Sequence, residues 1–135
     1  MEILSHSVLE TRAAGATLAR AARPGDVYAL IGELGCGKTE LVRGFVSALC
    51  ADAPVRSPSF SIVNIYEAPG FPLYHFDFYR LKKAVELVEI VFAEYIWGNG
   101  VCMIEWADMF PEVIPARARF IQFSDKGNGA RLIDI

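Results

Sequence analysis

A three-layer α/β fold with a central mixed β-sheet is the architecture that this 135-residue sequence predicts. Residues 27–31 form an unbroken apolar run, typical of a strand buried on both faces of a sheet. A glycine-containing segment, residues 32–39, follows directly. Apolar residues then recur at three- and four-residue spacing from 41 to 49, the period of a helix packed on one face. Strand, glycine loop and helix in this order, with further strands and helices around them, indicate a sheet between helical layers.

The first half of the chain divides at its Pro and Gly residues. Alanine-rich sequence favours a helix, and Arg23-Pro24-Gly25 ends the first one. The break at residues 51–54 closes the strand–loop–helix unit, and Ala68-Pro69-Gly70 is a predicted turn. In order, we expect a helix at about 9–22, the strand at 27–31, a helix to about 50, and a short strand at 62–66.

The second half begins with a predicted strand at 73–76. A helix is predicted at 81–97, with Leu87, Val91 and Tyr95 on one side. Asn99-Gly100 breaks the chain before another buried strand. The remaining expected elements are a strand at 101–104 and two strands at 118–123 and 131–135, joined by a hairpin at 126–129. No repeat or linker interrupts this series, so we expect residues 1–135 to form one domain.

The segment from Gly32 to Thr39 matches the phosphate-binding loop pattern G-x-x-x-x-G-K-[ST] at every fixed position. Its glycines leave backbone N–H groups free to surround phosphate oxygens. Lys38 brings a positive charge to the β- and γ-phosphates, and the Thr39 hydroxyl can ligate magnesium. The nucleotide-binding residues expected in this segment are Glu33, Leu34, Gly35, Cys36, Gly37, Lys38, Thr39 and Glu40. The sequence therefore predicts that the chain binds a nucleoside triphosphate with magnesium.

Two carboxylates follow buried strands and are candidates for the rest of the site. Asp77 follows the apolar run 73–76, and Glu105 follows 101–104. Open α/β sheets bind ligands at the carboxyl ends of their strands, where these acids could hold the magnesium shell and place a water. Together with Lys38 they are the candidate catalytic residues. The alternative is that either acid only caps a strand, and spacing leaves open which one ligates magnesium directly.

The polar loop Ser57-Pro58-Ser59-Phe60-Ser61 lies between these two parts of the predicted site. Its hydroxyls, Ser59 among them, could contact the γ-phosphate or the magnesium shell, so that the loop responds to the bound nucleotide. An ordinary polar turn is an equally good interpretation. His75, on the strand before Asp77, is interpreted as a structural histidine and not as a base.

Composition excludes several classes of protein. A net charge of −3 disfavours direct binding to the nucleic-acid backbone, which needs clustered Lys and Arg. No apolar stretch approaches the length of a membrane span, and three scattered cysteines without metal spacing favour a reduced compartment. We therefore expect a soluble cytoplasmic protein. The absence of an N-K-x-D segment, and of D-x-x-G after the strand at 73–76, disfavours a regulatory GTPase.

Taken together, the motifs resemble the TsaE (YjeE) family, the ATPases of bacterial tRNA threonylcarbamoyladenosine synthesis. The resemblance covers nearly the whole chain, and the combination of motifs is far more specific than the phosphate loop alone. The matching stretches are Gly25-Asp26, Gly32 to Thr39, Arg43-Gly44-Phe45, Ser57-Pro58-Ser59-Phe60, Leu73 to Leu81, Glu94-Tyr95 and Ile104-Glu105-Trp106.

The resemblance implies an ATPase that supports two partner proteins, TsaB and TsaD, and that meets tRNA only through them. It further implies that Lys38 and Thr39 hold phosphates and magnesium, and that Asp77 and Glu105 serve the magnesium shell and water. Ser59 would lie on the switch-like loop and Trp106 near the nucleotide. Slow hydrolysis alone and stimulation by the partners are expected.

Two other functions stay open at this point. A phosphotransferase (kinase) acting on a small molecule shares the loop, the magnesium and the carboxylates, but it requires an acceptor pocket and a base. A third possibility keeps the nucleotide as a structural ligand and makes partner binding the whole function. The alternatives differ in their products and in their dependence on the two carboxylates.

Overall fold

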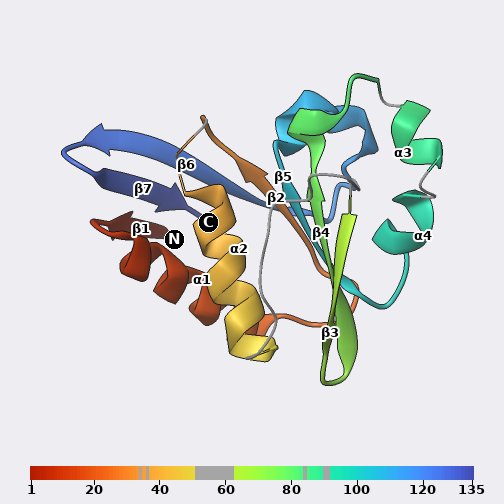
Figure 1. Ribbon diagram of the computed structural model, residues 1–135, viewed down its shortest axis with the longest axis horizontal. Helices are drawn as coiled ribbons and strands as arrows, with labels where there is room; N and C mark the ends of the chain where they lie inside the picture. Colours follow the sequence, from red (N-terminus) through yellow and green to blue (C-terminus); the bar gives the residue numbers. More distant parts are fainter. Residues whose placement is uncertain (34, 36, 51–62, 84, 90–91) are drawn as a thin grey trace.

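The computed structural model describes residues 1–33, 35, 37–50, 63–83, 85–89 and 92–135 (Figure 1). The described strands form one sheet in the order β1-β7-β6-β2-β5-β4-β3. β2 pairs in parallel with β5 and β6, and β4 with β5, whereas the other pairs are antiparallel. The strands are β1 (Glu2–Ser5), β2 (Val27–Ile31), β3 (Val63–Ala68), β4 (Phe71–Asp77), β5 (Val101–Glu105), β6 (Arg119–Gly127) and β7 (Ala130–Asp134). The predicted α/β class and mixed sheet are confirmed.

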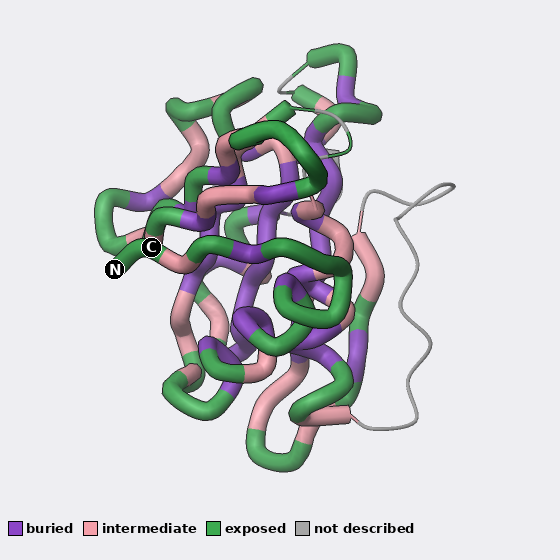
Figure 2. The backbone as a smooth tube through the Cα atoms, turned by 90° about the vertical axis from the view of Figure 1, so that its left-hand side faces the viewer, coloured by how far each residue is buried: buried purple, intermediate pink, exposed green. Residues whose placement is uncertain are grey.

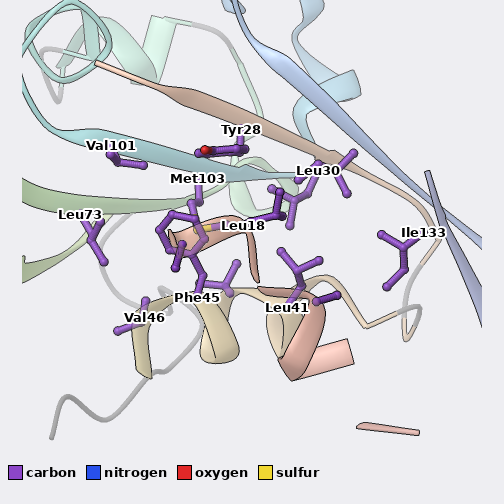
Figure 3. Close-up of a cluster of buried hydrophobic side chains, with 14 of the residues drawn as sticks. Leu18, Tyr28, Leu30, Leu41, Phe45, Val46, Leu73, Val101, Met103 and Ile133 are labelled. Atoms are coloured by element: carbon purple, nitrogen blue, oxygen red, sulfur yellow. The ribbon is translucent and has the colours of Figure 1, made fainter. Parts of the chain in front are cut away.

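Two long helices, α1 (Val8–Ala21) and α2 (Lys38–Leu49), cover one face of the sheet (Figure 1). Glycines allow the two helices to touch: a Cβ added at Gly44 would lie 1.9 Å from the backbone oxygen of Arg12, and one at Gly15 would lie 2.1 Å from that of Leu41. Between α2 and the sheet, Phe45 packs among apolar side chains of β2 and β5 (Figure 3). This cluster fixes where α2 begins relative to the strand ends.

Shorter helices cover the other face: α3 (Val85–Glu89), α4 (Phe92–Ile96) and the 3₁₀ turns η1 (Phe78–Arg80), η2 (Ala107–Met109) and η3 (Pro111–Val113). Their core is aromatic. The rings of Phe76 and Phe92 meet edge to face with centroids 5.0 Å apart, and Phe78 packs 5.6 Å from Phe92. Burial follows the strands through the middle of the molecule, whereas most turns are exposed (Figure 2). None of the helices in the described part of the chain is long and apolar enough for crossing a membrane.

Most predicted elements are present, and two differ. β1 has no counterpart among the predictions; it pairs with β7, so that both ends of the chain lie together. The helix predicted at 81–97 is wrong at its beginning, because residues 81–83 are not helical. A side chain explains this: Glu86 accepts hydrogen bonds from the backbone N–H groups of Lys82 and Lys83, at 2.7 and 3.1 Å, ahead of α3. The predicted hairpin is confirmed, with Asn128 and Gly129 at positive φ between β6 and β7.

Candidate functional site

The carboxyl ends of three neighbouring strands meet the beginning of α2. In the sheet, β5 lies between β2 and β4, and all three run parallel. Their register places Leu30 and Asp77 on either side of Glu105. β2 continues through the glycine loop into α2, which starts at Lys38. The loop, the helix N-terminus and the two predicted carboxylates therefore lie at one edge of the sheet, where this class of sheet binds ligands.

Two glycines shape the described part of the loop. Gly35 has a φ of 77° and Gly37 a φ of 100°, a left-handed conformation that side chains rarely adopt. Gly37 is the N-cap of α2 and provides no side-chain hydrogen bond to the first turn. The N–H groups of that turn, with the positive end of the helix dipole, make this terminus suited to an anion.

Lys38 lies inside this loop and is only 4% exposed. Its Nζ donates hydrogen bonds to the backbone oxygens of Gly32 and Glu33, the latter at 3.1 Å. It also lies 3.8 Å from the ring centroid of Trp106, a cation–π distance. Trp106 follows Glu105 and has a left-handed backbone with φ 58°, rare for a bulky residue. The ammonium group thus joins the loop to the wall formed after β5.

A chain of polar contacts runs from α2 into the sheet. The Thr39 hydroxyl donates to Oε1 of Glu105 at 2.8 Å, and Oε2 of Glu105 lies 2.5 Å from Nε2 of His75. Glu105 and His75 are 3% and 1% exposed. Both oxygens of this carboxylate are therefore held, one by the predicted magnesium-ligating hydroxyl and one by an imidazole.

Asp77 occupies the neighbouring strand end. One carboxylate oxygen accepts a hydrogen bond from the backbone N–H of Tyr79 at 3.0 Å, and the other lies 3.9 Å from Nε of Arg80. Burial and the nearby charge of Glu105 raise the pKa of Asp77 above its usual value of 3.8; the Tyr79 N–H and the Arg80 charge act in the opposite direction. A carboxylate with a raised pKa is a better proton acceptor than an exposed one.

These groups line a cavity of about 410 Å³, large enough for a small ligand. Its walls come from the loop, the start of α2, the ends of β4 and β5, and the turn after β4. A larger cavity of about 700 Å³ adjoins it, shares Gly35 and Trp106, and extends along β6 and β7. The smaller cavity contains the predicted chemistry, since both carboxylates, Lys38 and Thr39 line it.

The oxygen ligands in the smaller cavity fit a magnesium ion that is bound together with a nucleotide. Among the described residues, no three His, Cys, Asp or Glu side chains come together as a self-sufficient metal site. Magnesium bound with a nucleotide does not need one, because it takes one or two protein oxygens and completes its shell with phosphate oxygens and water. Thr39 and Glu105, in contact with each other, are protein oxygens of that kind.

The structure brings most of the predicted site residues together. Those that line the smaller cavity are Gly35, Gly37, Lys38, Thr39, Glu40, Asp77, Glu105 and Trp106. Of these two cavities, Glu33 lines the larger one. Leu34, Cys36 and Ser59 lie outside the residues that the structure describes. The side chain of Glu40 contacts Arg12 at 2.7 Å and Arg43, so it links α1 to α2 beside the cavity.

Sequence reasoning missed the position of three residues. His75, interpreted as structural, contacts Glu105 directly. Its place two residues before Asp77 on a strand was a usable signal, because side chains alternate and both must share a face. The ring of Tyr79 lies 4.8 Å from that of Trp106 at the cavity, tilted by 39°. Arg131 donates to the backbone oxygen of Gly35 at 3.0 Å, a contact between segments 96 residues apart that spacing could not reveal.

Fold and site together define a P-loop NTPase-like α/β protein, in which a glycine loop joins a central strand to a helix. The family model described as threonylcarbamoyl adenosine biosynthesis protein TsaE matches residues 5–133. The chain therefore belongs to the TsaE family of tRNA threonylcarbamoyladenosine biosynthesis, and the predicted resemblance is confirmed.

Individual relatives agree with this assignment. The chain is similar to the tRNA threonylcarbamoyladenosine biosynthesis protein TsaE of Bacillus subtilis, with 39% identity over 124 residues, 92% of this chain and 77% of the relative. It is 31% identical to the protein of the same name from Treponema pallidum, over 100% of this chain and 99% of the relative. The crystal structure of Bacillus subtilis YdiB superimposes with a TM-score of 0.81 and 32% identity, covering 98% of this chain and 82% of that one.

Proposed function

We propose that the chain is a magnesium-dependent ATPase subunit that supports a TsaB–TsaD machinery forming threonylcarbamoyladenosine in tRNA, in the cytoplasm. Family membership supports the pathway. The observation that carries the ATPase is the contact of the Thr39 hydroxyl with Glu105 in the cavity that Lys38 also lines. A hydroxyl at the start of the helix and a carboxylate at the end of a strand are the pair that holds magnesium beside a phosphate loop.

Each residue has a task that follows from its position. The backbone N–H groups of the loop and the first turn of α2 bind phosphate oxygens. Lys38 exchanges the carbonyl oxygens of Gly32 and Glu33 for phosphate oxygens of the nucleotide. Thr39 and Glu105 hold the magnesium shell, and magnesium when bound neutralises the charge that develops on the phosphates. Asp77 accepts a hydrogen bond from the attacking water and orients it.

Slow turnover of the isolated chain follows from the charges around the cavity. Within the described residues, the cationic side chains lining it are Lys38 and Arg80, and Arg80 is exposed and faces Asp77. Phosphoryl transfer gains a large part of its rate from an added positive charge that a partner can supply. We therefore assign the stimulation of hydrolysis to TsaB and TsaD. Contact with tRNA is assigned to the same partners, because the net charge of −3 disfavours direct binding to nucleic acid.

The experiment is a calorimetric titration of the chain with ATP and with GTP in the presence of magnesium, followed by phosphate release from ATP. Binding of ATP in preference to GTP, with slow release of phosphate, is the expected result. Equal binding of both nucleotides would contradict the assignment of ATP. Failure to bind either would contradict the proposal as a whole.

A second candidate function is a small-molecule phosphotransferase, favoured by the cavity of about 700 Å³ beside the loop, which has room for an acceptor. Labelled γ-phosphate distinguishes the two functions. An ATPase delivers the label to inorganic phosphate, whereas a phosphotransferase incubated with a mixture of small metabolites delivers it to an organic product.

A further inference from the structure

His75 lies on β4 with its imidazole almost completely buried, 1% exposed. Its Nε2 is 2.5 Å from Oε2 of Glu105, and among the described residues its Nδ1 has no hydrogen-bond partner. Its neighbours on the same face are Leu73 and Asp77 on its own strand, Met103 opposite it on β5 and Asn64 opposite it on β3. A residue needed only for packing at this position would be apolar, because a buried polar atom without a partner costs free energy.

The contact with Glu105 accounts for a polar residue at this position. A carboxylate at the end of a side chain with three rotatable bonds can turn unless both oxygens are held. Thr39 holds Oε1 at 2.8 Å from one side, and His75 holds Oε2 from the other. Removal of the imidazole would leave Oε2 buried without its partner, and the carboxylate would turn to find another.

We propose that His75 is a positioning residue: its Nε2 fixes the carboxylate of Glu105 so that Oε1 stays at Thr39, where the magnesium shell forms. This inference rests on the proposed function, since it assigns the ion to the Thr39–Glu105 pair. His75 itself touches neither nucleotide nor metal. Its loss weakens magnesium binding in the nucleotide complex and leaves metal-free nucleotide binding unchanged. Partners that orient a metal ligand through a hydrogen bond contribute about 10- to 100-fold in metal affinity.

Two amide variants separate positioning from packing. In His75→Gln the amide nitrogen can reach the place of Nε2 and donate to Glu105, whereas the shorter amide of His75→Asn cannot reach it. Phe76→Leu is the matched control, because Phe76 is buried beside His75 in the sequence but belongs to the aromatic cluster of the opposite face. If His75→Asn does not fold, His75→Leu, which fills more of the volume, takes its place.

The readout is Trp106 fluorescence, since its ring lies over Lys38 at the cavity. All variants carry Trp97→Phe, which removes the other tryptophan, an exposed one. The chain is titrated with the non-hydrolysable analogue AMP-PNP in EDTA, and with magnesium chloride at saturating AMP-PNP. His75→Asn is expected to raise the half-saturating magnesium concentration about 10- to 100-fold. His75→Gln and Phe76→Leu are expected to stay within a few-fold of the parent, and all are expected to bind AMP-PNP alike in EDTA.

Each other result overturns the inference in a distinct manner. Unchanged magnesium binding in His75→Asn shows that Glu105 needs no positioning by His75. An equal loss in Phe76→Leu assigns the effect to stability, and an equal loss in His75→Gln shows that the donated hydrogen bond is not its source. If the parent chain binds no AMP-PNP under any condition, the proposed function itself fails, a result separable from the others because it precedes the magnesium titration.

Discussion

Lys38 binds backbone oxygens at the beginning of its own phosphate loop. Its ammonium group lies among the carbonyl oxygens of Gly32 and Glu33 and against the ring of Trp106. Nucleotide phosphates offer stronger, charged acceptors at the same place. Under the proposed function, the side chain exchanges these acceptors for phosphate oxygens.

Lys38→Ala is expected to weaken binding of AMP-PNP with magnesium by about 10- to 100-fold, because a hydrogen bond to a charged group contributes about 1.5–3 kcal/mol. Titration calorimetry measures this directly, and circular dichroism verifies that the variant is folded. Lys126→Ala is the matched control, since Lys126 is an exposed lysine at the β6–β7 hairpin. A loss of affinity in Lys126→Ala as large as that in Lys38→Ala would show a general charge effect and contradict the assignment.

Asp77 makes stability depend on pH. Because its folded-state pKa is raised, its contribution to the free energy of unfolding is greatest below pH 3.8 and is lost as pH rises through the folded-state pKa. In EDTA, Asp77→Asn is therefore expected to be more stable than the parent at pH 7, with little difference near pH 3. Urea unfolding at both pH values measures this difference. Asp108→Asn, at an exposed position, is the control. A change in the free energy of unfolding of Asp77→Asn that is the same at both pH values would contradict the account.

The sequence identified some of the site residues but not the contacts between them. Asp77 and Glu105 could be found because each follows an apolar run that only a buried strand explains. The spacing of His75 and Asp77 indicates that both share a face of β4. The contact of His75 with Glu105 depends in addition on the register of β4 against β5, which spacing does not reveal.

At the scale of the elements, α2 is placed by close contact with α1. Gly44 lies against the backbone of Arg12, and the same two helices are joined by the Glu40 side chain through Arg12 and Arg43. The start of α2 carries Lys38 and Thr39, so this packing determines where the phosphate-binding groups lie relative to the ends of β4 and β5.

Gly44→Ala is expected to lower the free energy of unfolding by about 3 kcal/mol, because the new Cβ would lie 1.9 Å from the Arg12 oxygen and the helices must separate. Urea unfolding gives the value. Ser47→Ala, at an exposed position of the same helix, is the control and is expected to change little. Equal stability of Gly44→Ala and the parent would contradict the close packing described for the two helices.

The predicted elements were most accurate where the hydrophobic period was long or the apolar run unbroken, as in α1, α2, β2 and β5. β1 escaped prediction because four residues carry too little pattern, and its pairing with β7 joins opposite ends of the chain. The helix predicted at 81–97 began too early. The hydrophobic period does not show that the Glu86 side chain accepts hydrogen bonds from the backbone N–H groups of Lys82 and Lys83.

For the whole molecule, the sheet separates two layers with different tasks. The layer of α1 and α2 presents the phosphate loop, and the aromatic layer of short helices and turns carries Tyr79 and Trp106 to the cavity. A partner that contacts the turn after β4 would act on Asp77 and Arg80 together. This arrangement is the physical basis for expecting that hydrolysis depends on partners.

The most direct test of the central claim is phosphate release from ATP with magnesium, measured for the chain alone, with TsaB and TsaD added, and for Lys38→Ala under both conditions. The account predicts slow release by the chain alone, at least about 10-fold stimulation by the partners, and loss of that stimulation in Lys38→Ala. Release that is unchanged by the partners, or stimulation that persists in Lys38→Ala, would contradict a partner-coupled ATPase at this site.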